Sequence, residues 1–484
     1  MFRFALSAPR LSVLALAFMP LPVAARTAPP VAAVQTAPVA RTITIGGVAI
    51  PYDASFAEYV LKDATGAPRA TISGTSYVRR DVQDAAARPV LFAFNGGPGA
   101  SSSPLHFDAM GPRVLTSART GVEDNPQSLL DAADLVFVDP VGTGFSRTLG
   151  DAGKSPYWTV PDDADAMLRY IRQWLKAHGR AASPVYIAGE SYGGTRLAML
   201  AKDAGDLNLA GLIFVSPSLD PGEDKSDLAF ALALPSMAVA AVQNGRVDAA
   251  GRSVPQIFEE ARAFALSDYL VALAQGSALP PADKARMAQR MSAIIGLPAG
   301  TIARTDLRVD TEDYRKALRQ SEGLVVGRLD TRVTAPVPKE EPNRPSAAND
   351  PALGLGKSNV ILSKPIAAYL RDELHVPVDR DYVSLSLDVN FQWDWTKGAS
   401  FIERPDLLAN VRALMEQKPA LRVMMITGYY DLTIPVMAVR YRVEHAQLPM
   451  DRVELAERES GHSVLGGAEG RATMRPLLIP FLTK

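Results

Sequence analysis

A serine flanked by glycines is the residue in this sequence whose surroundings best suit it for chemistry. Residues 189–193 read GESYG and fit the pattern G-x-S-x-G around Ser191. The apolar run SPVYI before them is typical of a buried strand, and LAMLAKDAG after them is typical of a helix. A strand-to-helix turn of this kind exposes the serine hydroxyl, and its strained backbone needs small neighbours. The pattern predicts a nucleophilic serine, although any turn rich in glycine and serine can match it.

A serine hydroxyl attacks only when a base removes its proton and an acid orients that base. His462 lies in ESGHSV just beyond the last predicted strand, where Gly461 permits a close approach. Asp431 lies in ITGYYDLTIP at the end of the penultimate predicted strand. The order Ser191, Asp431, His462 is the order of the triad in hydrolases built on a parallel sheet. Taken singly, His462 could be an exposed loop histidine and Asp431 could cap a turn.

The glycine-rich segment FNGGPGASSS follows another predicted strand. Consecutive glycines let backbone N–H groups point at a developing oxyanion. A phosphate-binding loop is the alternative, but no lysine follows these glycines. The chain has no cysteine, and no two histidines have ligand spacing on one helix. We therefore predict no disulfide, no metal and no cofactor.

Five segments together resemble the signature blocks of the serine carboxypeptidases, a family of the α/β-hydrolase superfamily. They are FNGGPGASSS, DLVFVDPVGTGFS, AGESYGG, GYYDLTIP and SGHSV, in that order, between Phe94 and Val464. The resemblance implies a peptidase that releases C-terminal residues from peptides through an acyl-enzyme.

The resemblance also implies a role for each matching residue. Ser191 would be the nucleophile, Asp431 the orienting acid and His462 the base. The backbone N–H groups of Gly97 and Tyr192 would form the oxyanion hole. Asn95, Gly96 and Glu190 would hold the terminal carboxylate of the substrate. Glu190 can do so only when it is protonated or shares a proton, which implies a preference for acidic pH.

The chain departs from the family pattern where a second carboxylate-binding Glu would stand. The matching position in HFDAMGPR is Ala109. Asp108 is adjacent, but neighbouring helical residues point about 100° apart, so the acid pair is expected to be incomplete. His106 or Arg113 could supply a different carboxylate contact. Substrate preference and pH optimum are therefore open.

These departures keep three functions under consideration. The leading one is a serine carboxypeptidase. An esterase or acyltransferase would use the same machinery on another substrate, and a catalytically silent binding protein would keep only the fold. Trp393 and Trp395 in FQWDW could line the cleft or pack between cap and core, and Arg196 could pair with a buried acid.

The elements that must position these residues follow an α/β pattern. Residues 41–79 alternate between apolar and polar, which predicts antiparallel hairpins. The runs RPVLFAF, ADLVFVD, SPVYIAG and AGLIFVS are continuously apolar and stop at Gly or Pro, as strands of a buried parallel sheet do. PDDADAMLRYIRQWLKAHGR between two of them reads as a helix. We predict an α/β-hydrolase fold: a mostly parallel sheet, antiparallel N-terminal strands, helices on both faces and a helical cap.

The pattern changes after the fourth apolar run. Residues 221–354 are rich in alanine and helical in character, with only the weak run GLVVGRL resembling a strand. We interpret them as a helical cap inserted between two parts of the hydrolase core, 41–220 and 355–484. The insertion also accounts for the long separation between the serine and the other two triad residues.

The N-terminus predicts export. Arg3 and Arg10 precede an apolar stretch, LSVLALAFMPLPV, and the small residues VAA end the segment. Residues 1–25 are therefore expected to be a signal peptide rather than a buried helix. Residues 26–40 would be a Pro/Ala-rich tether. Export without cysteines suits a bacterial periplasm or the surrounding medium. With a net charge of −1, no nucleic acid or membrane partner is expected after cleavage, and the oligomeric state is open.

Overall fold

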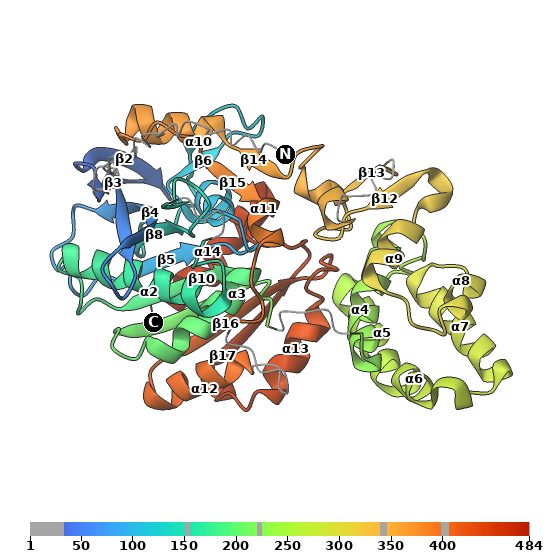
Figure 1. The fold of residues 1–484 in the computed structure, drawn as a ribbon. Coiled ribbons are helices and arrows are strands. Elements are labelled where there is room, and N and C mark those ends of the chain that lie inside the picture. The colour runs from blue at the N-terminus through green and yellow to red at the C-terminus, as the bar shows by residue number, and fades with distance from the viewer. Residues whose placement is uncertain (1–32, 151–154, 220–224, 339–345, 398–405, 484) are drawn as a thin grey trace, which may run out of the picture. The chain divides into compact units, whose positions relative to one another are not determined.

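Apolar runs that stop at Gly or Pro form the central strands of the structure. The structure is a computed structural model that describes residues 33–483 except 151–154, 220–224, 339–345 and 398–405. The predicted signal peptide and residues 26–32 of the predicted tether lie outside the described residues. The part of the chain from residue 33 onward packs as one unit (Figure 1).

The main sheet has eleven strands within the described residues. Its path runs through β1 (Val34–Gln35), β3 (Val48–Lys62), β4 (Pro68–Arg79), β8 (Asp134–Asp139), β5 (Val90–Phe94), β10 (Val185–Glu190), β11 (Leu209–Val215), β16 (Arg422–Gly428) and β17 (Val453–Arg458). β2 (Val39–Ile45) pairs with β3, and β9 (Arg147–Thr148) pairs with β4.

Strand direction follows the predicted division. The N-terminal strands β1 to β4 pair antiparallel, and from β8 to β17 every pairing on the path is parallel. β1 and the start of β2 fall within the predicted tether, so that segment joins the sheet from Val34 onward. Because parallel strands end at one edge, the residues after β5, β10, β16 and β17 share an edge of the sheet.

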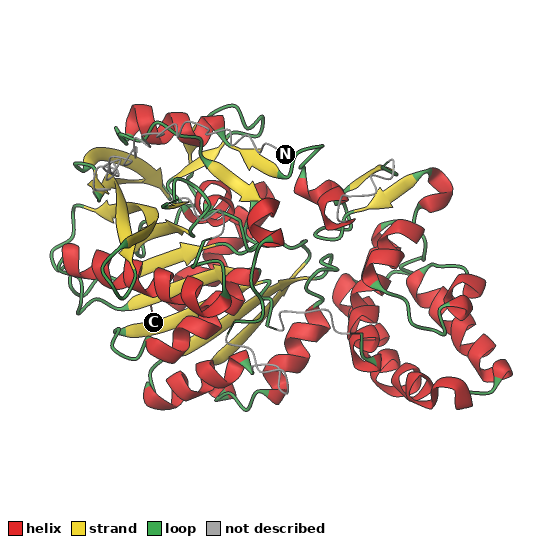
Figure 2. Cartoon of the chain, in the orientation of Figure 1, coloured by secondary structure: helices red, strands yellow, loops and turns green. Residues whose placement is uncertain are grey.

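Helices cover both faces of this sheet (Figure 2). The helices of the hydrolase core are α1 (Ser103–Leu105), α2 (Val160–Ala177), α3 (Tyr192–Leu200), α10 (Lys364–Ala368), α11 (Leu387–Phe391), α12 (Leu407–Gln417), α13 (Val436–His445) and α14 (Gly467–Thr483). α2 coincides with the helix predicted there, and Thr159 caps it by accepting a hydrogen bond from the Asp162 N–H. The predicted α/β-hydrolase fold is confirmed.

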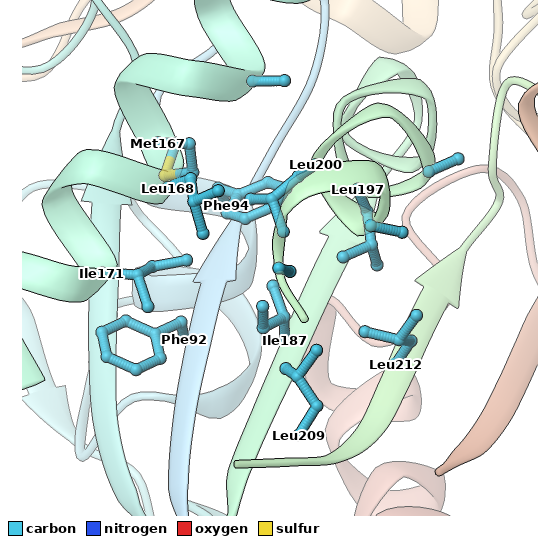
Figure 3. Close-up of a cluster of buried hydrophobic side chains, with 14 of the residues drawn as sticks. Phe92, Phe94, Met167, Leu168, Ile171, Ile187, Leu197, Leu200, Leu209 and Leu212 are labelled. Carbon is cyan, nitrogen blue, oxygen red and sulfur yellow. The ribbon is translucent and has the colours of Figure 1, made fainter. Parts of the chain in front are cut away.

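Side chains of successive strand residues point to opposite faces, which divides the core in two. On β5, Phe92 and Phe94 pack with α2 and α3, together with Ile187 of β10 (Figure 3). Leu91 and Ala93 point the other way and pack with α14 and neighbouring helices. Both faces of the central strands are thus buried, which is why their sequences are apolar without alternation.

The inserted region is mainly helical. Its helices are α4 (Asp227–Gln243), α5 (Val254–Phe264), α6 (Leu270–Gln275), α7 (Pro281–Ile295), α8 (Ala299–Arg304) and α9 (Thr311–Ala317). The weak run GLVVGRL supplies β12 (Leu324–Val326), which pairs antiparallel with β13 (Thr334–Pro336). The insertion therefore contains a short hairpin that the sequence pattern barely indicates. Its assignment as a separate cap domain remains a prediction.

Two further two-stranded sheets lie outside the main one. They are β6 (Arg113–Leu115) with β7 (Val122–Asp124), and β14 (Val360–Leu362) with β15 (Val383–Ser386). Across the described ranges, none of the helices has the length and apolarity that a membrane crossing requires.

Candidate active site

The turn after β10 holds Ser191 in the conformation that a nucleophile of this kind requires. Ser191 has φ +62° and ψ −127°, a region that residues with a side chain rarely occupy. Its N–H donates to the Val215 carbonyl at 2.9 Å, and its own carbonyl accepts from the N–H groups of Gly194 and Ser218 at 2.8 and 3.0 Å. These bonds, made to the next strand and the following helix, fix the strained turn.

Glycines on both sides of the turn are required by close backbone contacts. A Cβ at Gly189 would lie 2.3 Å from the carbonyl oxygen of Gly193. A Cβ at Gly96 would lie 2.4 Å from the backbone nitrogen of Tyr192. The glycine-rich loop after β5 therefore packs directly on the start of α3, as the predicted oxyanion hole needs.

Two backbone N–H groups at this contact have no acceptor among the described hydrogen bonds. Tyr192 is the first residue of α3, where N–H groups lack partners within the helix. Gly97, in the neighbouring loop, has φ +99° and likewise donates to no described acceptor. Free N–H groups at a helix N-terminus favour a negative charge, so this pair could stabilise an oxyanion.

Asp431 and His462 are brought together from the loops after β16 and β17. Nδ1 of His462 lies 2.6 Å from Oδ2 of Asp431, and Asp431 is fully buried. Oδ1 of Asp431 accepts from the N–H groups of Thr433 and Ile434 at 2.7 and 3.0 Å. Burial lowers the pKa of His462, but the charge and hydrogen bond of Asp431 outweigh burial, so the net pKa is raised.

The His462 loop lies over the residue that precedes Ser191. Oγ of Ser463 donates to Oε1 of Glu190 at 3.2 Å, and Oγ of Ser216 donates to the His462 carbonyl at 2.7 Å. Among the described hydrogen bonds, none joins the Ser191 hydroxyl to the imidazole. Catalytic hydrogen bonds are often long without substrate, so this geometry is compatible with a base at His462.

Glu190 is a buried acid with an unusually high pKa. It is 3% exposed, and burial raises its pKa to about 7. The charge of His462 and the Ser463 hydrogen bond act in the opposite direction, whereas the charges of Asp108 and Asp431 raise the pKa further. A carboxyl of this kind is partly protonated near neutral pH and can donate a hydrogen bond to an anion.

Asn95 and Arg196 contact each other where the glycine-rich loop meets α3. Oδ1 of Asn95 accepts from the Leu105 N–H at 3.2 Å, and its Nδ2 donates to no described acceptor. Arg196 donates to the Asn95 carbonyl and lies 2.6 Å from Oδ2 of Asp163. Arg196 is fully buried and pairs with a buried acid, as the sequence suggested. Its bond to the Asn95 carbonyl links α3 to the glycine-rich loop.

The segment at the missing second Glu differs from the expected geometry. Residues His106–Met110 form a π-helical turn, so the angle expected between neighbouring residues of an α-helix does not apply there. Ala109 is buried in the core. Asp108 instead lies near enough for its negative charge to raise the pKa of Glu190. The expectation that the acid pair is incomplete stays a prediction.

The two alternative carboxylate contacts are engaged elsewhere. His106 is buried between the rings of Phe107 and Phe137, and its Nε2 lies 2.7 Å from the Tyr77 hydroxyl. Burial lowers the pKa of His106, which keeps it neutral. Arg113 pairs with Asp124 at 2.5 Å. These contacts give no support to the suggestion that either residue contacts a substrate carboxylate, which stays untested.

Trp393 and Trp395 pack on the residue that follows Ser191. The ring centroid of Tyr192 lies 5.3 Å from that of Trp393 and 5.6 Å from that of Trp395, both edge to face. Trp393 is buried, whereas Trp395 is 41% exposed. One of the two is thus a packing residue, and the other presents a ring to solvent beside the turn.

Sequence reasoning missed the residues that hold His462 by its backbone. Oγ of Ser216, in the hydrolase core, donates to the His462 carbonyl. The Leu329 carbonyl, at the tip of the inserted hairpin, accepts the His462 N–H at 2.7 Å. A serine after a strand and a short apolar run in an insertion carry no signal of this role. The described part of the chain has no cluster of His, Asp and Glu that could bind a metal ion.

Sequence comparison with known proteins covers the part of the site that contains the glycine loop and Ser191. Residues 77–229 match the family model described as serine carboxypeptidase. Serine carboxypeptidase-like 36 of Arabidopsis thaliana is 32% identical over 142 residues, which are 27% of this chain and 29% of that protein. The pheromone-processing carboxypeptidase KEX1 of Yarrowia lipolytica is 33% identical over 133 residues, 26% of this chain and 21% of that protein. The matched stretch thus spans less than a third of these relatives.

A solved structure extends the likeness to the whole fold. Kex1(delta)p, a prohormone-processing carboxypeptidase from Saccharomyces cerevisiae, aligns with 88% of this chain and 90% of its own, with a TM-score of 0.56 and 14% identity. The family match holds the glycine loop and Ser191, whereas Asp431 and His462 lie outside it. Residues 77–229 are thus similar to the serine carboxypeptidase family, and the alignment with Kex1(delta)p shows a shared fold.

Proposed function

We propose that this protein is a serine carboxypeptidase that releases C-terminal residues from peptides. Glu190 carries the proposal, because it precedes Ser191, is buried and has a pKa raised to about 7 by that burial. A protonated carboxyl beside the nucleophile can hydrogen-bond the terminal carboxylate of a peptide, which an ionised one would repel. The amide group of Asn95, which donates to no described acceptor, supports binding of the same carboxylate.

In the proposed reaction, Nε2 of His462 takes the proton of the Ser191 hydroxyl as its Oγ attacks the scissile carbonyl carbon. The N–H groups of Gly97 and Tyr192 stabilise the resulting oxyanion. The C–N bond then breaks, and His462 gives its proton to the departing amino acid. Water, deprotonated by His462, attacks the acyl carbon. The C–Oγ bond then breaks, Oγ of Ser191 takes the proton from His462, and the shortened peptide leaves. Asp431 orients the imidazole and stabilises its charged form through the 2.6 Å contact.

The nucleophile is tested by covalent labelling. A fluorophosphonate probe is expected to label the purified protein, and Ser191→Ala is expected to abolish labelling. Ser463→Ala is a matched control, because it removes a hydroxyl that contacts Glu190 and leaves the nucleophile in place. Labelling that persists in Ser191→Ala would overturn the assignment.

Carboxypeptidase specificity is tested with three substrates that share one acyl group. A blocked dipeptide acid, its amide and its simple ester differ only at the C-terminus. Faster hydrolysis of the acid than of the amide below pH 7 supports an exopeptidase. Equal rates on acid and amide would reject that specificity.

Esterase or acyl-transfer activity is the second candidate. It is favoured by Ala109, which removes one of the two acids expected for carboxylate binding and is buried in the core. Ester hydrolysis that is much faster than acid hydrolysis at every pH would favour this candidate. A protein with no reaction toward any serine-directed probe would favour a binding role instead.

We also propose that residues 1–25 are a signal peptide and that the protein acts in the periplasm or outside the cell. The proposal is supported by the arginines, the apolar stretch and the small residues at 23–25. The N-terminal sequence of the exported protein tests it, with residue 26 expected as the first. Export with residues 1–25 still attached would reject cleavage.

A further inference from the structure

The tip of the inserted hairpin lies against both loops that carry the proposed acid and base. The tip consists of residues 327–333, between β12 and β13. The Gly327 N–H donates to the Val333 carbonyl at 2.8 Å and closes it. The tip belongs to the insertion, yet three of its backbone groups bond to the hydrolase core.

The acid loop is held on both sides of Asp431. The Leu432 N–H donates to the Arg328 carbonyl at 2.9 Å, and the Thr331 N–H donates to the Tyr430 carbonyl at 3.0 Å. Tyr430 and Leu432 are the immediate neighbours of Asp431. The path of the backbone through Asp431 therefore depends on the hairpin tip.

The base loop is held by the same tip. The His462 N–H donates to the Leu329 carbonyl at 2.7 Å. Beside it, a Cβ at Gly461 would lie 2.6 Å from Cβ of Asp330, so the two segments are in close contact. The tip therefore bridges the loops after β16 and β17, which are also joined directly by the bond from the Tyr430 N–H to the Ser460 carbonyl at 3.0 Å and by the His462–Asp431 contact.

Asp350 determines the orientation of the tip. Its carboxylate is 3% exposed and accepts the Leu329 N–H at 3.0 Å, the Arg328 N–H at 3.1 Å and the Ala352 N–H at 3.0 Å. The N–H of Leu329 and the carbonyl of Arg328 belong to one planar trans peptide unit, so they point in opposite directions. When Asp350 holds the N–H, the carbonyl is aimed at Leu432.

We propose that Asp350 is a positioning residue for the catalytic pair, acting through the hairpin tip. It touches neither substrate nor triad side chains; it fixes the carbonyls of Arg328 and Leu329, which in turn fix the backbone at Asp431 and His462. The catalytic roles of Asp431 and His462 in this proposal rest on the proposed function. Displacement of a catalytic group by about 1 Å can cost on the order of a hundredfold in rate.

The test compares Asp350→Ala and Asp350→Asn with a matched control. Asparagine keeps one acceptor oxygen and the volume of the side chain, so it retains part of the contact and the fold. Asp310→Ala removes another aspartate of the insertion that accepts a backbone N–H, that of Glu312 at 2.7 Å at the start of α9. Each protein is measured for fluorophosphonate labelling rate and for the titration of the His462 imidazole by NMR.

The charged groups that face the imidazole are Asp431, Glu190 and Arg328, and their signs make the titration informative. Loosening the contact with Asp431 lowers the pKa of His462. Loss of the Arg328 guanidinium alone raises it, and Arg328→Gln, which keeps the backbone bonds, measures that effect separately. Opposite shifts in Asp350→Ala and Arg328→Gln therefore distinguish displacement of the acid from loss of a cation.

We expect Asp350→Ala to label about ten- to a hundredfold more slowly and to titrate at lower pH, Asp350→Asn to be intermediate, and Asp310→Ala to match the wild type. A labelling rate and a His462 titration in Asp350→Ala equal to those of the wild type would overturn the proposal, even if the protein were less stable. If the wild type does not label, the proposed nucleophile fails, whereas the titration still tests Asp350.

Discussion

Nδ1 of His462 lies 2.6 Å from Oδ2 of Asp431, in a site where neither residue is more than 7% exposed. The second oxygen of Asp431 accepts two backbone N–H groups, so the carboxylate cannot rotate away from the imidazole without breaking them. The contact fixes which nitrogen of His462 faces the acid and leaves Nε2 for the proposed reaction. It also favours the charged imidazole, since buried opposite charges are weakly screened.

Asp431→Asn is predicted to reduce kcat by on the order of 10³–10⁴-fold, because an amide holds the imidazole in the wrong tautomer and cannot stabilise its charge. The pKa of His462 should fall, since the Asp431 charge that raises it is gone. The base must be neutral, so the acid limb of the pH–rate profile moves to lower pH. Steady-state kinetics between pH 4 and pH 9 measure both effects.

Asp406→Asn is the control for that substitution. Asp406 also accepts a backbone N–H, that of Ala409 at 3.2 Å, where it caps α12. It should leave kcat and the acid limb unchanged. An Asp431→Asn protein with wild-type kcat would show that His462 needs no orienting acid.

Glu190→Gln is predicted to abolish the alkaline loss of activity on peptides with a free C-terminal carboxylate. Burial raises the pKa of Glu190 to about 7, so Glu190 is expected to ionise above that pH and to repel the substrate carboxylate. The ratio of kcat/KM on the acid to kcat/KM on the amide should therefore fall as pH rises above about 7. In Glu190→Gln the ratio should not change with pH, since an amide does not ionise.

Use of the ratio removes the contribution of His462, which acts on both substrates alike. A wild-type ratio that is constant from pH 5 to pH 9 would show that Glu190 does not meet the substrate carboxylate. Ser463→Ala provides a graded comparison, because its hydroxyl donates to Oε1 of Glu190 and lowers the pKa of that carboxyl. The fall in the ratio should begin at higher pH in that variant.

Asp108→Asn is predicted to move the same fall to lower pH. The negative charge of Asp108 raises the pKa of Glu190, so its removal lets Glu190 ionise earlier. The substrate-ratio measurement across pH detects the shift. A fall that begins at the wild-type pH would mean that Asp108 is too distant to act on Glu190.

Ala109→Glu is the informative comparison, because it restores the acid at the position that the family pattern indicates. Ala109 is fully buried, so a carboxyl there would lack both water and partners. We expect a large loss in the free energy of unfolding and no gain in activity on acid substrates. A stable variant with such a gain would show that the π-helical turn rearranges to admit the side chain.

The parts of the site that depend on local pattern could be predicted from the sequence. The turn at Ser191 follows from an apolar run, a serine between glycines and a helical run, all within about fifteen residues. The parallel strands follow from apolar runs buried on both faces. The order of Ser191, Asp431 and His462 then placed all three residues at one edge of the sheet.

The parts that depend on tertiary contacts could not be predicted. The π-helical turn at His106–Met110 leaves no trace in the apolar pattern, yet it changes the directions of the side chains along this segment. β12 has only three residues and is stabilised by its partner strand and by the loops that its tip contacts, so its own propensity indicates little. Asp350 acts on backbone groups more than twenty residues away, which no spacing rule anticipates.

Asp139→Asn is predicted to stabilise the protein at neutral pH. Asp139 ends β8 and is 5% exposed, and burial raises its pKa from 3.8 to about 6, against the hydrogen bonds of Ser102 and Tyr382. A carboxyl whose pKa is raised by folding stabilises the folded state most below pH 4, and that contribution is lost as pH rises through about 6. The shift corresponds to about 3 kcal/mol at pH 7.

Asparagine suits this position because all three bonds to Asp139 use one oxygen. Oδ1 accepts from the N–H and Oγ of Ser102 at 2.8 and 2.7 Å and from the Tyr382 hydroxyl at 3.1 Å, so an amide oxygen can keep them. Urea unfolding at pH 4, 5, 6 and 7 should show the two proteins equally stable at pH 4 and the variant progressively more stable above it. Glu190 titrates in both proteins, so only the difference between them reports Asp139. A difference that stays constant with pH would show that Asp139 titrates alike in the folded and unfolded chains.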